Sequence, residues 1–413
     1  MTAIANLPDL RPSLLLDFAN SGRVDPRIQC TRASSATCFG PDGKLRTVAA
    51  NVPRIAYDPA TGKCLGLLVE ESRSNLFSYT KDFPQSVWGK INLAPTVADA
   101  VIAPDGTLTA DGLVPNTSNV SHYVDRSVTG LGIASSYCGS IYVKKGTARD
   151  GLLRMFGTGN AMHGVRLNFD TGVATFINSN EYLSQGGVTT SWGAENVGNG
   201  WWRLWVAGYP DAAADRRLFR VTVSNSAGIE NYEGDGLTPG KYVWGAQFEA
   251  GTFPTSYIPT EGSAVTRASD VPFIAGSWAS GTVLQRYRPQ SMSPPAGQNY
   301  FTCALNAGSA RMLGAYYNGN KFINLAGVTA GSLRSDSNAI AMAFGGGGVQ
   351  SVANGGAMTT GAYTDAVATS LHIGTSNVGI TGASAFGPIN GHVEQVAMYS
   401  SKLVAQHMQR LTA

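Results

Sequence analysis

Charged residues and long apolar runs are both scarce in this 413-residue chain. Only 14% of the residues are charged while 50 are glycine, a balance that disfavours long solvated helices and favours short strands joined by tight turns. No stretch of about 18 successive apolar residues occurs, so no membrane insertion is expected. No Lys/Arg-rich run occurs either, and the formal net charge is only +3, so nucleic acid is not an expected partner.

Cysteine pairs with metal-ligand spacing are also missing. The five cysteines are widely spaced and include no CxxC pair, so no zinc site is expected. We predict free, buried thiols made in a reducing cytoplasm, while three cysteines near the start of the chain leave one bridge open. The five are Cys30, Cys38, Cys64, Cys138 and Cys303.

The beginning of the sequence lacks the basic stretch and apolar run of a secretory signal. We therefore expect the protein to be made and kept in the cytoplasm of the producing cell. Any action outside that cell then requires release by lysis.

Catalytic signatures are absent as well. The sequence has no HExxH, no GxSxG, no phosphate-binding loop with its Lys and no dinucleotide fingerprint. Glu70 and Glu71 are adjacent, but on a strand their side chains point to opposite faces, which does not suit a pair of glycosidase carboxylates. We predict that the chain is not an enzyme and that it needs no cofactor.

The pattern of turns and apolar residues predicts an all-β protein in three parts. Residues 1–80 are rich in turn signals and poor in apolar residues, which indicates an extended arm or collar that packs on other domains or on sister subunits. Residues 81–260 alternate apolar and polar residues, and residues 261–413 are rich in Ala, Gly, Ser and Asn. We expect two antiparallel β-sandwiches, a jelly roll and a concanavalin- or laminin-G-like domain.

The jelly-roll prediction rests on strands of period two. Residues 165–169 alternate cleanly, Asp170-Thr171-Gly172 makes a turn, and residues 173–177 alternate again, which predicts a hairpin. Residues 137–144, 218–224 and 241–248 read as further strands. About eight such strands at regular spacing are typical of a two-sheet jelly roll.

A short helix is predicted at the end of the chain. Leu403, His407, Met408 and Leu411 share one helical face, and Ser400 or Ser401 is in place to cap the helix. We expect His407 to pack on that face rather than to bind a ligand.

Tryptophans give the strongest signal for ligand binding, because their faces stack on sugar rings. In the strand around residues 201–206, Trp202, Leu204 and Val206 form the expected core face. Trp201, Arg203 and Trp205 then share the other face, which either contacts a glycan or is covered by another domain, a sister chain or a loop. Two further candidates for glycan contact lie in loop-like contexts, Trp88 and Trp192.

The densest acidic cluster lies at residues 230–236. Glu230, Glu233 and Asp235 are separated by small steps, and their oxygens could hold a structural calcium ion, which takes six to eight such ligands. The cluster does not match the EF-hand loop, and the alternative is an ordinary polar hairpin tip.

Several motifs in the opening segment occur in a fixed order. They are LLDFANSGRVDPR at residues 15–27, TRASSAT at 31–37, DGKLR at 42–46, ANVPR at 50–54, GLLVEE at 66–71 and RSNL at 73–76. This order resembles the front of a phage and prophage family of head spike fibre or tail fibre proteins. TRAS recurs at residues 266–269, where the third part begins, as a reused linker would.

A second block agrees with this resemblance. WGAQFEAG at residues 244–251, PTSYIPT at 254–260 and GWWR at 200–203 resemble strands of the carbohydrate-binding-type jelly rolls common in such proteins. The last likeness indicates that Trp201 can also hold a framework role.

The resemblance implies a virion protein that assembles as an oligomer, usually a homotrimer, contacts other virion structural proteins and attaches to bacterial surface polysaccharide. The polar residues of the motifs are the predicted assembly residues: Asp17, Arg32, Asn51, Arg54, Glu70 and Arg267. Two alternatives stay open, a purely structural capsid-decoration or baseplate subunit and, less favoured, a capsule depolymerase. Such enzymes usually carry long parallel β-helices with repeats, and none is evident here.

Overall fold

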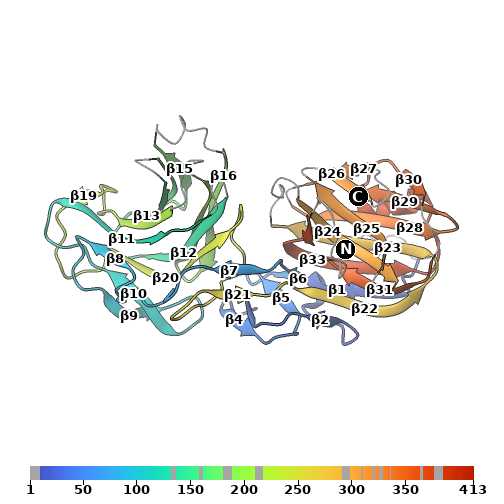
Figure 1. Ribbon diagram of the computed structural model, residues 1–413, viewed down its shortest axis with the longest axis horizontal. Helices are drawn as coiled ribbons and strands as arrows, with labels where there is room; N and C mark the ends of the chain where they lie inside the picture. Colours follow the sequence, from blue (N-terminus) through green and yellow to red (C-terminus); the bar gives the residue numbers. More distant parts are fainter. Residues whose placement is uncertain are drawn as a thin grey trace.

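The computed structural model describes residues 10–131, 136–157, 161–179, 188–209, 217–290, 298–307, 310–318, 321–324, 329–334, 336–362, 366–375 and 385–413. Nearly all of the regular secondary structure in these residues is β-strand, which confirms the all-β class. Figure 1 shows two sandwich lobes side by side, joined by the first strands of the chain, drawn in blue. We call them the jelly-roll lobe (residues 76–260) and the C-terminal lobe (261–413), and the joining part the N-terminal segment (10–75).

The jelly-roll lobe packs a six-stranded sheet on a seven-stranded one. The six-stranded sheet has the order β16 (Val188–Gly198), β17 (Trp201–Tyr209), β12 (Tyr137–Lys145), β20 (Lys241–Ala250), β10 (Leu108–Leu113), β9 (Val97–Ile102). The seven-stranded sheet has the order β15 (Ala174–Asn178), β14 (Met162–Asn168), β13 (Asp150–Phe156), β18 (Arg217–Val223), β11 (Val120–Val128), β19 (Asn231–Tyr232), with β8 (Gly89–Ile91) also paired to β11.

Alternation along these strands builds the core between the two sheets. Val165 and Leu167 are fully buried, and Arg166 between them points outward, as the period of two requires. The predicted hairpin is confirmed: β14 pairs with β15 in a register that joins Leu167 to Ala174. The strands predicted at 137–144, 218–224 and 241–248 correspond to β12, β18 and β20.

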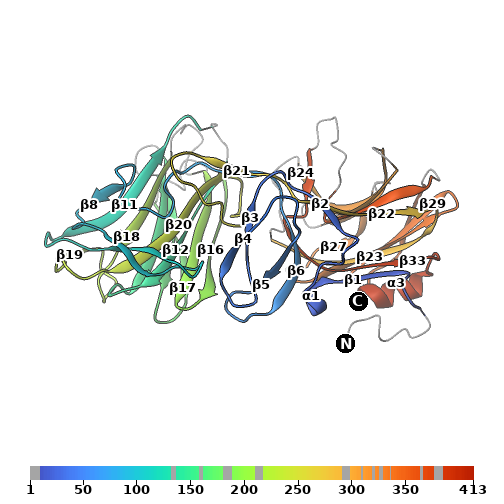
Figure 2. The same cartoon turned by 90° about the horizontal axis from the view of Figure 1, so that it is seen from below.

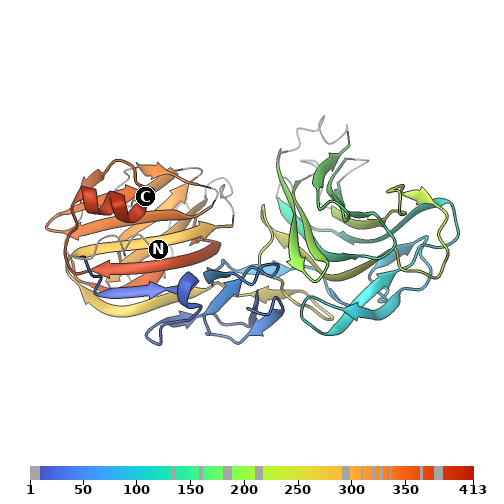
Figure 3. The ribbon, with the colours of Figure 1, turned by 180° about the vertical axis from the view of Figure 1, so that it is seen from behind.

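The C-terminal lobe is the second sandwich, and Figure 3 shows its strands and terminal helix from behind. One sheet has the order β30 (Thr359–Ala362), β29 (Gly348–Ala353), β28 (Asn338–Gly345), β23 (Gly281–Pro289), β33 (Gly391–Tyr399), β6 (Cys64–Val69), β5 (Arg54–Tyr57), with β1 (Leu14–Asp17) also on β33. The other has the order β2 (Gln29–Thr31), β22 (Val271–Trp278), β31 (Ala368–Ile373), β24 (Gln298–Ala307), β25 (Ala310–Asn318), β26 (Lys321–Asn324), β27 (Thr329–Ser332), with β32 (Ala385–Pro388) on β24.

The N-terminal segment contributes strands to the C-terminal lobe, so it is part of that fold and not only an arm or collar that packs on it. Strands β1, β5 and β6 extend one sheet of that lobe, and β2 extends the other. Where β6 meets β33, Gly66 has a φ of +112°, and a Cβ there would lie 2.3 Å from the carbonyl oxygen of Val393. Only glycine permits that approach.

The rest of the N-terminal segment fills the space between the lobes. The hairpin of β3 (Ala36–Phe39) and β4 (Leu45–Val48) lies there, beside the ribbon of β7 (Arg73–Asn75) and β21 (Val265–Arg267), as Figure 2 shows. The jelly-roll lobe is therefore an insertion between two parts of the chain that fold together.

Two short helices occur among the described residues. Helix α1 (Phe18–Ser21) follows β1, and α3 (Ala405–Thr412) buries Met408 and Leu411 against the C-terminal lobe, as predicted. Leu403 is buried but precedes the helix, and His407 is half-buried on it. The predicted serine cap is wrong, because the helix begins after Val404 with no side-chain cap. Neither helix is long and apolar enough to cross a bilayer. All five cysteines are free thiols.

Five ionised side chains meet where the three parts join, and we call them the junction cluster: Arg32, Arg54, Glu70, Arg267 and Asp270. Arg54 Nη2 donates to Glu70 Oε2 at 2.8 Å and also to Asp270 Oδ2. Arg32 Nη1 donates to Asp270 Oδ1 at 2.7 Å. All five side chains are at most 2% exposed, so these are interior ion pairs.

The jelly-roll lobe is tied to the same cluster through Ser256. Its amide and its hydroxyl donate to the two oxygens of Glu70, at 2.7 and 2.6 Å. Burial opposes ionisation of Glu70, but the charges of Arg267 and Arg54 and the Ser256 hydrogen bonds outweigh it and hold the pKa of Glu70 well below its usual value.

We predict that Glu70→Gln lowers the free energy of unfolding by about 3–5 kcal/mol, because it leaves buried arginines without a matched carboxylate. Urea denaturation followed by tryptophan fluorescence measures the loss. The control is Asp25→Asn, which breaks the surface pair with Arg27 and should cost below about 1 kcal/mol. Equal, small losses in both variants would contradict a stabilising junction cluster.

Candidate binding surface

The outer face of the six-stranded sheet is covered by the chain itself. Trp201 is only 1% exposed and packs with Leu45 of the N-terminal segment and Tyr257 of the jelly-roll exit. Arg203 is 5% exposed, and its Nη2 donates to Ser140 Oγ and to the Thr255 carbonyl. Trp201 and Arg203 therefore cannot contact a glycan in this conformation. The sequence left two alternatives for their face, glycan contact or coverage, and at these two residues coverage by other parts of the same chain is observed.

The other predicted tryptophans differ in access. Trp88 is 1% exposed, donates its indole N–H to the Tyr79 carbonyl and packs between aromatic rings of the core, so it too has no surface for a sugar. Trp205 is half-buried, and Trp192 is 37% exposed and stacks on Phe176 with 6.1 Å between ring centroids. Contact of Trp192 or Trp205 with a glycan stays a prediction.

The predicted calcium ligands are held apart by other partners. Glu230 accepts hydrogen bonds from Arg154 and Arg166, and Asp235 accepts the amides of Leu237 and Thr238. No group of three or more acidic, histidine or cysteine side chains among the described residues could hold a metal ion. Glu233 is exposed, and a calcium ion at residues 230–236 stays a prediction beside the alternative of a polar hairpin tip.

Four of the predicted assembly residues, Arg32, Arg54, Glu70 and Arg267, belong to the junction cluster inside the chain. Their observed role is to join parts of one chain, and burial leaves them no surface for a second chain. Asn51 is exposed and binds the Arg32 backbone: its side-chain oxygen accepts the Arg32 amide, and its own amide donates to the Arg32 carbonyl. Asp17 is half-buried and accepts two hydrogen bonds from the side chain of Asn20.

The outer face of the seven-stranded sheet carries a different set of side chains, which we call the arginine face: Tyr123, Asp125, Arg154, Phe156, Arg166, Arg220 and Glu230. The strand registers place Asp125, Arg220 and Arg154 side by side on β11, β18 and β13. Their neighbours along each strand, such as Val124 and Val221, are fully buried in the core, so the row points away from it. In Figure 1 the edge strands β15 and β19 lie higher than the central strands, so the sheet curves around this face.

Arg220 is at the centre of the arginine face. Its guanidinium carbon lies 3.7 Å from the ring centroid of Tyr123 and 4.8 Å from that of Phe156, so it has cation–π contacts with both. Its Nη2 donates to Asp125 Oδ2 at 3.0 Å, and its side chain remains 22% exposed. A planar donor, a carboxylate and aromatic rings are thereby held in one accessible place.

A second network holds the rest of the face rigid. Glu230 accepts from both nitrogens of Arg154 at 2.8 and 2.6 Å and from Arg166 at 2.6 Å. Arg166 also reaches Asp150, which in turn accepts from Arg149. Burial opposes ionisation of Glu230, but the hydrogen bonds of Arg154 and the charges of Arg154 and Arg166 outweigh it and lower its pKa. The face therefore presents charged groups in fixed positions.

The jelly-roll lobe also has a groove near its exit, with a volume of about 410 Å³. We call it the acidic groove; it is lined by Tyr79, Lys81, Asp82, Ala98, Asp99, Thr109, Asp111, Thr260 and Glu261. Asp111, 2% exposed, accepts the amides of Phe83 and Asp99. Burial outweighs these two hydrogen bonds and raises the pKa of Asp111 from 3.8 to about 6.

No protein-family model matches the chain, and no curated protein sequence matches it. Among solved structures it is similar to the CBM40 of the Ruminococcus gnavus IT-sialidase bound to α2,3-sialyllactose, at 13% identity and a TM-score of 0.26 over 33% of this chain and 84% of that one. It is also similar to mouse laminin α1 domains LG4-5, at 10% identity and a TM-score of 0.22 over 70% of this chain and 90% of that one. It is also similar to Trypanosoma rangeli sialidase in complex with sialic acid, at 10% identity and a TM-score of 0.26 over 73% of this chain and 60% of that one. These TM-scores are too low to carry an argument about function.

We predict that the stability of Asp111→Asn relative to the unsubstituted protein rises by about 2 kcal/mol between pH 4 and pH 6.5. The folded state holds the Asp111 proton more tightly than the unfolded state does. The free energy of unfolding of the unsubstituted protein therefore falls as the pH rises from 3.8 through the folded pKa of about 6. The amide of Asp111→Asn does not titrate, so the variant lacks this loss. Urea unfolding at several pH values measures the difference. Thr109→Val, in the same groove, should run parallel to the unsubstituted protein, and a parallel profile for Asp111→Asn would contradict the raised pKa.

Proposed function

We propose that this chain is a glycan-binding structural subunit of a phage-like virion, acting in a symmetric oligomer to attach particles to bacterial surface polysaccharide. The arginine face supports glycan binding. Guanidinium and carboxylate groups can each pair with neighbouring sugar hydroxyls, and aromatic rings stack on the C–H faces of a sugar. Because Arg220 and Glu230 are already held by protein partners, little side-chain freedom is lost when a ligand binds.

The proposed oligomer, taken to be a homotrimer, follows from the strength expected of one site. A single sugar site of millimolar affinity supplies only about 4 kcal/mol. Presenting several copies on one particle raises the overall avidity by roughly 10²- to 10⁴-fold without any new contact. A multivalent virion is the setting in which so weak a site suffices.

The virion location rests on the ordered motifs of residues 15–76, and the proposal includes contacts with other virion proteins and release by lysis. Within it the chain binds polysaccharide without cleaving it. In the described residues, the carboxylates of the arginine face are engaged by arginines, which lowers the pKa of Glu230 and suits it poorly to a general acid that must hold a proton near neutral pH.

We expect Arg220→Ala to weaken binding to a bacterial surface polysaccharide at least tenfold, because it removes the donor and frees the two rings that it holds. Arg220→Lys keeps the charge but not the planar stack on the rings. Its affinity for the polysaccharide should lie between those of Arg220→Ala and the unsubstituted chain. An array of bacterial polysaccharides first identifies the ligand, and titration of the purified chain then measures the dissociation constants.

Arg27→Ala is the matched control, since Arg27 is an exposed arginine on the N-terminal segment and should leave binding unchanged. Binding that is equal in Arg220→Ala and the unsubstituted chain would move the site elsewhere, with Trp192 the next candidate. No binding by the assembled particle to any polysaccharide would overturn the glycan proposal in favour of a purely structural subunit. Labelling intact particles with an antibody to this chain tests the virion location separately.

A further inference from the structure

His122 on β11 is completely buried, and both of its ring nitrogens lie against backbone carbonyl groups. Nδ1 is 2.5 Å from the carbonyl oxygen of Asn92, and Nε2 is 2.8 Å from that of Tyr232. Asn92 follows β8 and Tyr232 belongs to β19, and both of these strands pair with β11. One side chain therefore joins two edge segments of the seven-stranded sheet, and we call this arrangement the histidine bridge.

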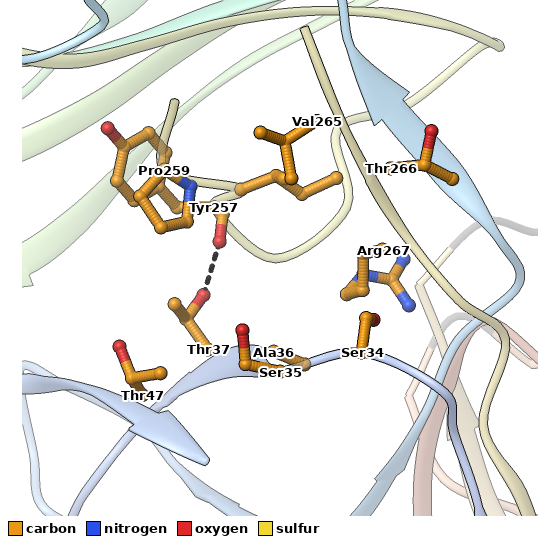
Figure 4. A pocket seen from close by; sticks show the side chains of 11 residues that line it. Ser34, Ser35, Ala36, Thr37, Thr47, Tyr257, Pro259, Val265, Thr266 and Arg267 are labelled. Atoms are coloured by element: carbon orange, nitrogen blue, oxygen red, sulfur yellow. Dashed lines mark hydrogen bonds between the residues drawn. The ribbon is translucent and has the colours of Figure 1, made fainter. Parts of the chain in front are cut away.

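The two carbonyl groups require a particular charge state of the ring. A carbonyl oxygen can only accept a hydrogen bond, so each contact needs a hydrogen from its partner. The Thr37 hydroxyl meets this requirement where it donates to the Tyr257 carbonyl, as Figure 4 shows. A neutral imidazole has a single N–H and a lone pair on its other nitrogen, so it can make only one of the two bonds. Only the charged ring, with two N–H groups, satisfies both Asn92 and Tyr232.

The charge on the ring is favoured by these carbonyl groups and not by a carboxylate partner in the described part of the chain. Burial alone favours the neutral ring, whereas two acceptors favour the charged one. The titratable and charged side chains of the elements around the ring are Lys90 on β8, Arg126 on β11, Lys241 on β20 and, at and after β19, Tyr232, Glu233 and Asp235.

Among the described residues, none of these six side chains forms a hydrogen bond or an ion pair with His122. Lys90, Arg126 and Lys241 donate to carbonyl oxygens elsewhere, and Asp235 accepts backbone amides of its own loop. The Tyr232 ring meets the imidazole edge-on, with 4.8 Å between centroids. The protonation of His122 is therefore coupled most directly to the two contacts that it makes.

We propose that the histidine bridge is a pH-sensitive switch: the charged ring holds residues 231–236 against β11, and loss of its Nε2 proton to solvent releases Tyr232. The Asn92 side is fixed independently, because its side-chain amide donates to the Ser121 carbonyl and its own carbonyl also accepts the Asn116 amide. Strand β19 has only two residues, so Tyr232 is the side that gives way.

Release of Tyr232 has a consequence for the arginine face. Glu230 lies two residues before Tyr232 and accepts hydrogen bonds from Arg154 and Arg166. When the far side of this short segment comes free, Glu230 is held by the arginines alone. The switch thus reaches the arginine face although no group of that face changes its charge, and it does not depend on what the face binds.

The test is hydrogen–deuterium exchange of the full chain at about pH 5 and about pH 8, which bracket the range where an ordinary imidazole changes its charge. With rates corrected for the intrinsic effect of pH, we expect the protection of amides 231–236 to fall by roughly tenfold at the higher pH, because a buried hydrogen bond is lost. The β14–β15 hairpin should keep its protection. In His122→Gln, whose amide donates at either pH, the difference between the two pH values should disappear.

His407→Gln is the matched control, because His407 is half-buried on α3 in the C-terminal lobe and its loss should leave the pH dependence of residues 231–236 unchanged. Nitrogen-15 NMR reads the charge of the ring directly and should show two protonated nitrogens in His122 at about pH 5 and one at about pH 8. The exchange and NMR measurements on the unsubstituted chain decide the matter even if His122→Gln does not fold. A neutral His122 at the lower pH, equal protection of residues 231–236 at both pH values, or an unchanged pH dependence in His122→Gln would overturn the proposal.

Discussion

The charge of a buried arginine must be balanced by carboxylates in the protein interior. In this chain those carboxylates come from distant parts of the sequence. Arg54 joins Glu70, a residue of its own segment, to Asp270, which lies beyond the whole jelly-roll lobe, and Ser256 of the jelly-roll exit completes the shell of Glu70. Breaking such a pair exposes a buried charge, so the pairing holds the three parts in one arrangement. The position of both lobes, and of everything that they cover, depends on it.

That arrangement decides which surfaces of the jelly-roll lobe are accessible. Because the N-terminal segment is fixed at the junction, Leu45 and the exit residue Tyr257 lie over the six-stranded sheet and bury Trp201 and Trp244. On the opposite sheet, Arg220 remains partly exposed between its two rings in the described part of the chain. Between these two outer faces, Arg220 is therefore more accessible than Trp201.

Sequence patterns predicted the sandwiches because the period of two is a local property of each strand, as in the β14–β15 hairpin. The repeated TRAS motif also pointed to the junction, where Arg32 and Arg267 meet the same Asp270. A pattern cannot tell what lies on the outer face of a sheet, which is why it left open whether Trp201 contacts a glycan or is covered, and why it kept Trp88 as a candidate for glycan contact. The arginine face was missed because Asp125, Arg154 and Arg220 are distant in sequence and become neighbours only through strand register. Their alternation with apolar residues was the available signal.

The pairing of β1 with β33 has a consequence for how the molecule is made. Ser13 and Met398 are hydrogen-bonded across 385 positions of the chain. At a synthesis rate of about 5–20 residues per second, the first strand waits roughly 20–80 s for its partner to leave the ribosome. During that interval the inserted jelly roll can complete its own fold, while the leading segment stays open. A nascent chain therefore carries unpaired strand edges that chaperones or neighbouring nascent chains can reach until β33 has been made.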